Sequence, residues 1–291
     1  MNNIEAIFTR KSDRTYLEKA VPEKLVEKLL AAYETYPRLN DLRQRLVVMP
    51  TKKVQAAMTG IVGSYGSMKN PPLYAIGISE RGKNDQVNFG HIFEQFILEC
   101  TKESLGTCWI GGFFKKSRLS HLIPMDANER IICVSPFGYA AKRRFSERTM
   151  RALIRADGRK PFDTRFFHKK WGQGAAAHLP DQAPFRKLLE TARWSPSASN
   201  AQPCHFVYDN QHIVLSVLTT LQKDYPTFIK KDRAEDLNFQ NVDAGIAMAH
   251  IELAAQELGM SGRWTMDIDD NEVRDKYAIV PEARIIGIFE M

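Results

Sequence analysis

Apolar residues recur along the chain at the two spacings that mark helices and strands. A helix with a leucine-rich face is predicted to open at Pro22-Glu23, because proline suits the first helical turn. A second helix is predicted over residues 88–105, where aromatic and aliphatic residues recur every three or four positions until Gly106. Short apolar runs predict buried strands at residues 46–49, 73–78, 130–134 and 205–208.

A third helix, over residues 238–258, is apolar on nearly every side and rich in alanine. A helix without a polar face is predicted to be buried, and small residues permit a close approach by another helix. The helix over residues 88–105 is its expected partner.

The order of these elements occurs twice. Residues 28–48 align with residues 187–207 without a gap. Later matches come at a smaller spacing and include Asn88 with Asn241, Glu99 with Glu252, Gly106 with Gly259, and Arg130-Ile131-Ile132 with Arg284-Ile285-Ile286. No counterpart of the strand at 73–78 is evident in the second copy. The sequence therefore predicts an α/β fold made of two homologous halves that form an intrachain pseudo-dimer.

Composition shifts divide the chain into three parts. Residues 1–144 form the predicted first half, and residues 181–291 a second, reduced half. Between them, residues 145–180 form a basic linker with a helix at about 146–156 and aromatic anchors such as Phe162 and Trp171.

Composition and charge narrow the class of protein. The chain is 44% hydrophobic and 26% charged, as in ordinary globular proteins. Its net charge of +7 suits nucleic acid, anionic lipid or a phosphorylated cofactor, but no nucleic-acid motif is present. Its apolar runs are too short to span a membrane and its N-terminus lacks a signal core, so we expect a cytoplasmic protein that binds neither nucleic acid nor membrane. The four cysteines lack metal-ligand spacing, which favours free buried thiols and no metal site.

The segment Arg10-Lys11-Ser12-Asp13-Arg14 is the first candidate for a binding site. Arginine gives bidentate hydrogen bonds to phosphate and serine adds one more donor. The alternative is a solvated basic turn before a helix.

A second candidate is the loop Cys108-Trp109-Ile110-Gly111-Gly112-Phe113. Adjacent glycines let the backbone approach a flat ligand, although a plain turn is the alternative. The second copy has Ser261-Gly262-Arg263-Trp264 here, and an arginine in place of glycine indicates that the two pockets are no longer equivalent.

The third candidate is the polar loop from Ser195 to Pro203, found only in the second copy. Its hydroxyl and amide groups can present donors and acceptors to a heteroaromatic edge. A surface turn is the alternative. The candidate ligand-binding residues of this loop are Pro196, Ser197, Ser199, Asn200 and Gln202.

Together these segments resemble the nitroreductase family of FMN enzymes, in the branch where two nitroreductase-like halves are fused. Gly138-Tyr139 and Arg159-Lys160-Pro161-Phe162 resemble the C-terminal segment of that family. In the family an obligate dimer shares each flavin, one subunit giving the basic turn, glycine loop and C-terminal cations, the other the polar loop. Here each half keeps a complementary set, which implies one FMN per chain.

The resemblance also implies roles. Arg10, Ser12, Arg159 and Lys160 are expected to hold the phosphate beside Lys11, and Arg14 to lie near the pyrimidine end of the ring. The backbone of Ile110, Gly111 and Gly112 is expected near N5, and Ser197, Ser199, Asn200 and Gln202 near the ribityl chain and ring edge, with Pro196 shaping their loop. Tyr65-Gly66 is a weaker candidate for a ring contact. No catalytic side chain is expected, because the flavin carries the chemistry. Cys108 is interpreted as a buried structural thiol rather than a redox group.

The expected activity is transfer of hydride from NAD(P)H through FMN to a small-molecule acceptor such as a nitroaromatic or quinone, with ping-pong kinetics. Three alternatives stay open: a flavin store or sensor with little turnover, an empty scaffold that binds a partner through the basic linker, and a reductive dehalogenase on the same fold. Fusion buries the usual dimer surface within one chain, which favours a monomer over a homodimer.

Overall fold

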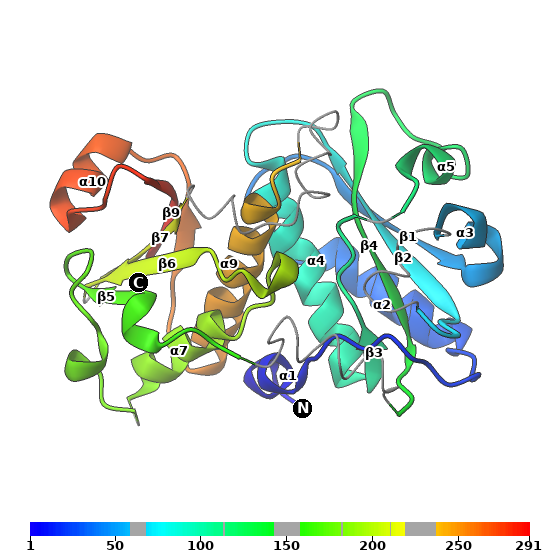
Figure 1. Cartoon of the computed structure of the whole chain (residues 1–291), viewed down its shortest axis with the longest axis horizontal. Helices are drawn as coiled ribbons and strands as arrows, with labels where there is room; N and C mark the ends of the chain where they lie inside the picture. The colour runs from blue at the N-terminus through cyan, green and yellow to red at the C-terminus, as the bar shows by residue number, and fades with distance from the viewer. Residues whose placement is uncertain (59–67, 113, 143–157, 182, 210, 219–236) are drawn as a thin grey trace.

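The computed structural model describes residues 1–58, 68–112, 114–142, 158–181, 183–209, 211–218 and 237–291. Two α/β halves lie side by side, each with its own sheet, and two long helices pack against each other between the sheets (Figure 1). The expected helix at about 146–156 and the pair Tyr65-Gly66 lie outside the described residues.

The first half holds an antiparallel sheet of four strands in the order β1-β2-β4-β3. The helix predicted to begin at Pro22-Glu23, with a leucine-rich face, is its helix α2. Its elements are α1 (Asn3–Thr9), α2 (Glu23–Thr35), β1 (Gln44–Pro50), α3 (Thr51–Met58), β2 (Leu73–Glu80), α4 (Asp85–Lys102), β3 (Leu105–Thr107), α5 (Lys116–Ser120) and β4 (Glu129–Tyr139).

The second half holds a sheet of five strands in the order β5-β6-β7-β9-β8. Strand β5 follows the first half in sequence but pairs in parallel with β6, so this segment completes the sheet of the second half. The elements from β5 onward are β5 (Phe166–His168), η3 (Ala176–His178), α7 (Pro184–Arg193), η4 (Ala198–Asn200), β6 (Cys204–Tyr208), β7 (His212–Leu218), α9 (Phe239–Glu257), β8 (Arg263–Thr265), α10 (Asp270–Tyr277) and β9 (Ala283–Glu290).

Strand β7 is the counterpart of β2 that the sequence did not reveal. It lies between β6 and β9 as β2 lies between β1 and β4. The register shifts at the same place in both sheets: after Gly77 of β2 the partner strand β4 has an unpaired residue, and after Leu215 of β7 the partner strand β9 has one. The expectation of no counterpart was wrong because β6 and β7 are joined by a short turn, whereas α3 separates β1 from β2.

Reciprocal contacts also correct the alignment of the long helices. A Cβ on Gly90 would meet the Val242 carbonyl oxygen at 2.2 Å, and one on Gly245 would meet the Val87 oxygen at 2.0 Å. Gly90 therefore corresponds to Gly245, and the match of Asn88 with Asn241 was wrong by two residues. The strands show a similar error. Leu46 lies opposite Gly77, and Phe206 lies opposite Leu215 at the matching register shift, so Leu46 corresponds to Phe206. The gapless alignment is therefore wrong by one residue in these strands. The match of Arg130 with Arg284 is correct, because the unpaired residue of each sheet, Ile132 in β4 and Ile286 in β9, lies two positions after the arginine.

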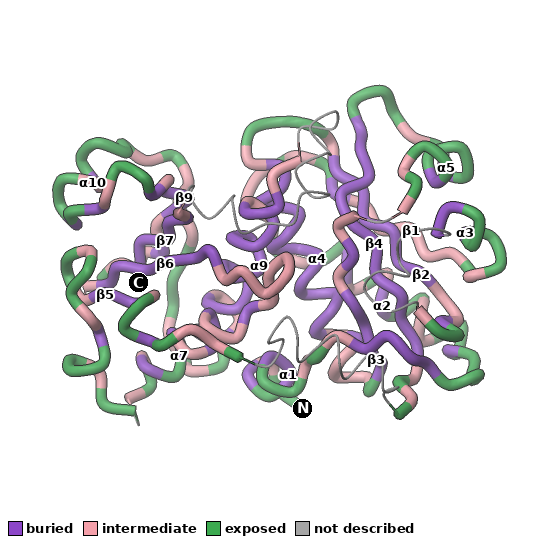
Figure 2. The backbone as a smooth tube through the Cα atoms, viewed as in Figure 1, coloured by how far each residue is buried: buried purple, intermediate pink, exposed green. Residues whose placement is uncertain are grey.

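The helices α4 and α9 form the centre of the molecule, and nearly all of their residues are buried (Figure 2). The close crossing at Gly90 and Gly245 confirms that the alanine-rich helix packs on its equivalent. Helix α4 begins at Asp85 and ends at Lys102, three residues earlier at each end than predicted. It ends before Ser104, which has a φ of 60°, whereas Gly106 lies in β3 against Asp13 and Ala140.

The segment after the first half is anchored as its aromatic residues predicted. Phe162 and Phe166 stack at 4.3 Å between ring centroids and are buried in the second half's core. All four cysteines are buried free thiols, as expected. Burial raises the pKa of the Cys133 and Cys204 thiols, which keeps them protonated and unreactive. Among the described helices, none is both long and apolar enough to cross a bilayer.

Candidate functional site

The basic turn lies directly beside the strand that leads into the glycine loop. Arg10 ends helix α1, where its backbone N–H donates to Ala6. The Asp13 N–H donates to the Thr107 carbonyl at 2.8 Å, and Ser12 forms a parallel bridge with the same residue. The structure thus brings together the turn and the loop, which are almost one hundred residues apart in sequence.

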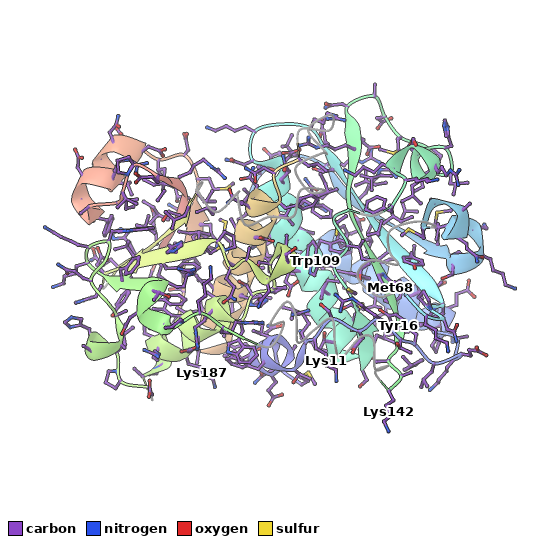
Figure 3. The ribbon with its side chains drawn as sticks, viewed as in Figure 1. Lys11, Tyr16, Met68, Trp109, Lys142 and Lys187 are labelled. Atoms are coloured by element: carbon purple, nitrogen blue, oxygen red, sulfur yellow. The ribbon has the colours of Figure 1, made fainter. Side chains whose placement is uncertain are left out.

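The side chain of Arg10 is 6% exposed and Arg14 is buried. Lys11, labelled in Figure 3, is exposed. Within the described part of the chain, no hydrogen-bond acceptor reaches Nε or Nη1 of Arg10 or Nε of Arg14. Unsatisfied donors on a buried cation are costly, and an anionic ligand would satisfy them. The donor set therefore fits a phosphate or another anion.

The two glycines of the loop have different surroundings. Ile110 exchanges backbone hydrogen bonds of 2.9 Å with Val134 and so fixes the loop to β4. A Cβ on Gly111 would lie 2.2 Å from the Phe239 ring at the start of α9, so packing between the halves requires glycine there. A Cβ on Gly112 would meet nothing within 4 Å. Gly112 therefore leaves its backbone open to approach, while Phe113 lies outside the described residues.

The C-terminal cations of the first half dock on the polar loop of the second. The Lys160 N–H donates to Gln202 Oε1 at 2.9 Å, and its ammonium donates to the Ala201 carbonyl at 2.9 Å. The Arg159 guanidinium donates to Asn200 Oδ1 at 3.4 Å. The amides of Asn200 and Gln202 both donate to the Gly158 carbonyl. These contacts join segments that the resemblance assigned to opposite halves.

The polar loop holds an unusual backbone. Ser199, Asn200 and Gln202 all have φ values between 51° and 56°, in the left-handed region that non-glycine residues seldom adopt. Such residues cost on the order of 1–3 kcal/mol each and collect at binding sites. Ser197 Oγ accepts the Gln202 N–H at 2.8 Å and holds the loop closed after Pro196. Asp243 on α9 accepts the Ala198 N–H at 3.1 Å, so the loop is fixed to the central helix.

Trp194 connects the two sets of residues. The Arg159 guanidinium lies 4.8 Å above its ring, a cation–π distance. Phe8, on the helix that ends just before Arg10, meets the same side chain in a T-shaped contact, with 5.8 Å between ring centroids. The basic turn, the C-terminal cations and the polar loop therefore converge where the halves meet.

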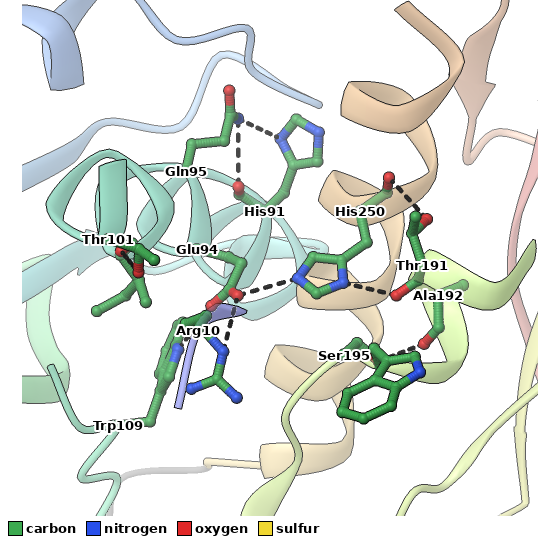
Figure 4. Close-up of polar contacts among 12 residues, drawn as sticks. Arg10, His91, Glu94, Gln95, Thr101, Trp109, Thr191, Ala192, Ser195 and His250 are labelled. Carbon is green, nitrogen blue, oxygen red and sulfur yellow. Dashed lines mark hydrogen bonds and ion pairs between the residues drawn. The ribbon is translucent and has the colours of Figure 1, made fainter. Parts of the chain in front are cut away.

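The sequence did not point to Glu94 and His250, which form a buried network beside this site (Figure 4). Glu94 accepts a hydrogen bond of 2.7 Å from the Trp109 indole N–H. Its other oxygen lies 3.0 Å from His250 Nε2 and 3.8 Å from Arg10 Nε. The only signal in the sequence was a carboxylate and a histidine within helices predicted to be mostly apolar.

The equivalent position in the second half is filled with apolar side chains. Leu39 donates its N–H to Asn88 as Ala198 does to Asp243, so a leucine stands where the site has alanine. Thr265 pairs with Ile288 as Ile110 pairs with Val134, so Met266 stands in place of Gly111. The earlier match of Arg263 to a loop glycine was wrong, since Arg263 lies in β8. Leu39 and Met266 both pack against the second half's core.

Comparison with known proteins agrees with this architecture. Residues 2–255 match the family described as "Putative TM nitroreductase". A putative nitroreductase from Thermotoga maritima has a TM-score of 0.59 at 19% identity, with 99% of this chain and 92% of that chain covered. An FMN-dependent nitroreductase from Clostridium difficile has a TM-score of 0.42 at 22% identity, covering 48% of this chain and 89% of that chain. No curated protein matches the sequence.

The family match spans most of the chain, so the protein belongs to this nitroreductase family. The expected fold, two nitroreductase-like halves in one chain, is confirmed. Family membership supports an oxidoreductase as the general class of enzyme.

Proposed function

We propose that the protein is an FMN-dependent oxidoreductase with one flavin per chain, which takes hydride from NAD(P)H and passes electrons to a nitroaromatic, quinone or similar acceptor. The observation that carries this proposal is the basic turn, where the buried Nε and Nη1 of Arg10 and Nε of Arg14 have no acceptor among the described residues. This turn pairs with the strand that leads into the glycine loop. FMN supplies a phosphate for these cations and a ring that accepts and returns hydride.

The residues of the chain would bind and orient the cofactor. Arg10, Ser12 and Lys11 would hold the phosphate from the first half, with Arg159 and Lys160 closing from the other side. The polar loop, held rigid by Asp243 and by its own hydrogen bonds, would face the ribityl chain and the ring edge. A buried positive charge near the pyrimidine end, from Arg14, would favour the reduced anionic flavin and raise its potential.

One flavin per chain follows from the filled second position. Leu39 and Met266 are larger than Ala198 and Gly111, which stand at the equivalent places of the first site, and both pack against the second half's core. Flavin quantitation on protein saturated with FMN tests this stoichiometry. One FMN per chain supports the proposal, two would refute the shared site, and no flavin spectrum with no shift in melting temperature would refute the function.

Two substitutions test the site. Arg10→Ala is expected to raise the FMN Kd roughly 10- to 100-fold, because a hydrogen bond to a charged group contributes about 1.5–3 kcal/mol. Asn200→Ala is expected to raise it roughly 2- to 10-fold, because a hydrogen bond between neutral groups contributes about 0.5–1.5 kcal/mol. Lys187, exposed on α7, provides a charge-matched control, and Lys187→Ala should leave Kd unchanged. Equal Kd values for all three variants would place FMN elsewhere.

A flavin store or sensor is the second candidate, favoured by the closed second position, since a chain that lost one site could also have lost turnover. Stopped-flow mixing with NADPH separates the two functions. A flavin that bleaches and then reoxidises with a quinone supports the enzyme, and a flavin that stays oxidised supports the store.

A further inference from the structure

The carboxylate of Glu94 is the point where three parts of the candidate site meet. It lies on α4 with its side chain fully buried. Through its two oxygens it contacts Arg10 of the basic turn, Trp109 of the glycine loop and His250 of α9. Its side chain thus joins the basic turn to the glycine loop.

The hydrogen bonds fix how many protons this network holds. His250 Nδ1 lies 2.8 Å from the Thr191 carbonyl oxygen, which only accepts, so Nδ1 carries a hydrogen. The contact of 3.0 Å between His250 Nε2 and Glu94 Oε1 then needs one more proton between the two groups.

We propose that Glu94 is a positioning residue that aligns Arg10 with the cofactor phosphate and Trp109 with the flavin ring. This inference rests on the proposed function. Glu94 holds the Arg10 guanidinium through charge at 3.8 Å, which leaves the hydrogen-bonding capacity of Nε and Nη1 for an anion. It holds the glycine loop through the indole N–H at 2.7 Å. His250 keeps the carboxylate in place from the second half.

The chain offers a matched control on the same two helices. His91 on α4 and Glu252 on α9 form a second His–Glu pair across the interface, at 2.7 Å. Among the described residues, the side chains of this pair bond to each other, and His91 also contacts Gln95, which lies on the same helix and outside the basic turn and the glycine loop. Glu252→Gln therefore removes a comparable charge from the same interface without acting on Arg10 or Trp109.

Glu94→Gln tests the contact with Arg10. The amide still accepts from Trp109 and donates to a neutral His250, so the carboxylate charge facing Arg10 is lost together with the proton that Glu94 and His250 shared. A buried arginine that regains rotamer freedom costs about 0.5–1.5 kcal/mol on binding, so we expect FMN Kd to rise up to about tenfold. Riboflavin lacks the phosphate, and its Kd should change less than twofold. A loss shared equally by both ligands would show a merely structural role and overturn the proposal.

Trp109→Phe tests the contact with the loop, because it keeps a ring and removes the indole donor. Kd should rise several-fold for FMN and riboflavin alike. In the Arg10→Ala background, Glu94→Gln should add no further loss for FMN, while Glu252→Gln should leave Kd within twofold of the parent throughout.

The outcomes separate the two proposals. One FMN bound per wild-type chain, with Kd unchanged in Glu94→Gln, would overturn the role of Glu94 alone. The role of Glu94 would also be overturned if the increases in Kd from Arg10→Ala and Glu94→Gln multiplied in the variant that carries both substitutions. Failure of the wild-type protein to bind FMN would overturn both. Should Glu94→Gln fold poorly, the Trp109→Phe result decides, since an unchanged Kd there refutes the loop contact.

Discussion

The crossing of α4 and α9 is the feature most exposed to a single added methyl group. In Gly245→Ala the new Cβ would lie 2.0 Å from the Val87 carbonyl oxygen and 2.8 Å from the His91 nitrogen. Both are backbone atoms of α4, so no side-chain rotation relieves the clash and the helices must separate. Overpacking of this kind costs about 1–3 kcal/mol, and alanine returns about 1 kcal/mol through its helix propensity. Taking the upper part of the range, we expect a net loss of about 2 kcal/mol in the free energy of unfolding.

Urea and thermal unfolding measure this loss. For a chain of 291 residues, about 2 kcal/mol corresponds to a fall of roughly 3–4 °C in Tm. Gly90→Ala should behave in the same way, and the double variant should lose less than the sum, since one separation of the helices accommodates both methyl groups. Gly112→Ala is the control, because its Cβ meets nothing within 4 Å. Stability of Gly245→Ala equal to or above wild type would refute the close crossing.

Two further predictions concern pH and the closed second position. Burial, and then the charge of Arg165, lower the pKa of His205 to about 3. Below about pH 6.5 the unfolded chain therefore binds a proton at His205 that the folded chain does not bind. The free energy of unfolding falls as the pH drops from about 6.5 towards 3. His205→Gln should lose less stability than wild type between pH 7 and pH 4.5 in urea titrations, and identical losses would contradict the cause. Leu39→Ala should lower the free energy of unfolding by about 2 kcal/mol or more while FMN stays at one per chain; a second bound FMN would show that Leu39 alone closes that position.

The helices and strands followed from local patterns. The proline at the start of α2, the apolar runs of β1, β2, β4 and β6, and the uniformly apolar α9 appeared in the structure near their predicted bounds. Local patterns succeeded because the spacing of the apolar residues indicates whether one face or the whole of an element is buried. Helix ends were less certain, as α4 shows, because Ser104 rather than a glycine adopts the left-handed conformation after it.

The alignment of the two halves failed where tertiary contact sets equivalence. The sequence matched Asn88 to Asn241 by identity, but the structure matches Asn88 to Asp243, since both accept a backbone N–H from the loop before the first strand. Asparagine and aspartate can both accept that hydrogen bond, so the residue type differs between the two halves while the position of the acceptor is the same. The same reasoning explains why β7 was not recognised as the partner of β2.

The sequence by itself determined the two-fold repeat, the family and the three segments expected to bind a cofactor. Those features depend on residue type and on spacing along the chain, which the sequence carries directly. Only the tertiary structure decided that Glu94 joins Arg10 to Trp109, that Gly111 serves the packing of Phe239, and that Leu39 and Met266 fill the second position. These depend on contacts between residues far apart in the chain, and such contacts exist only once α4 and α9 have brought the two halves together.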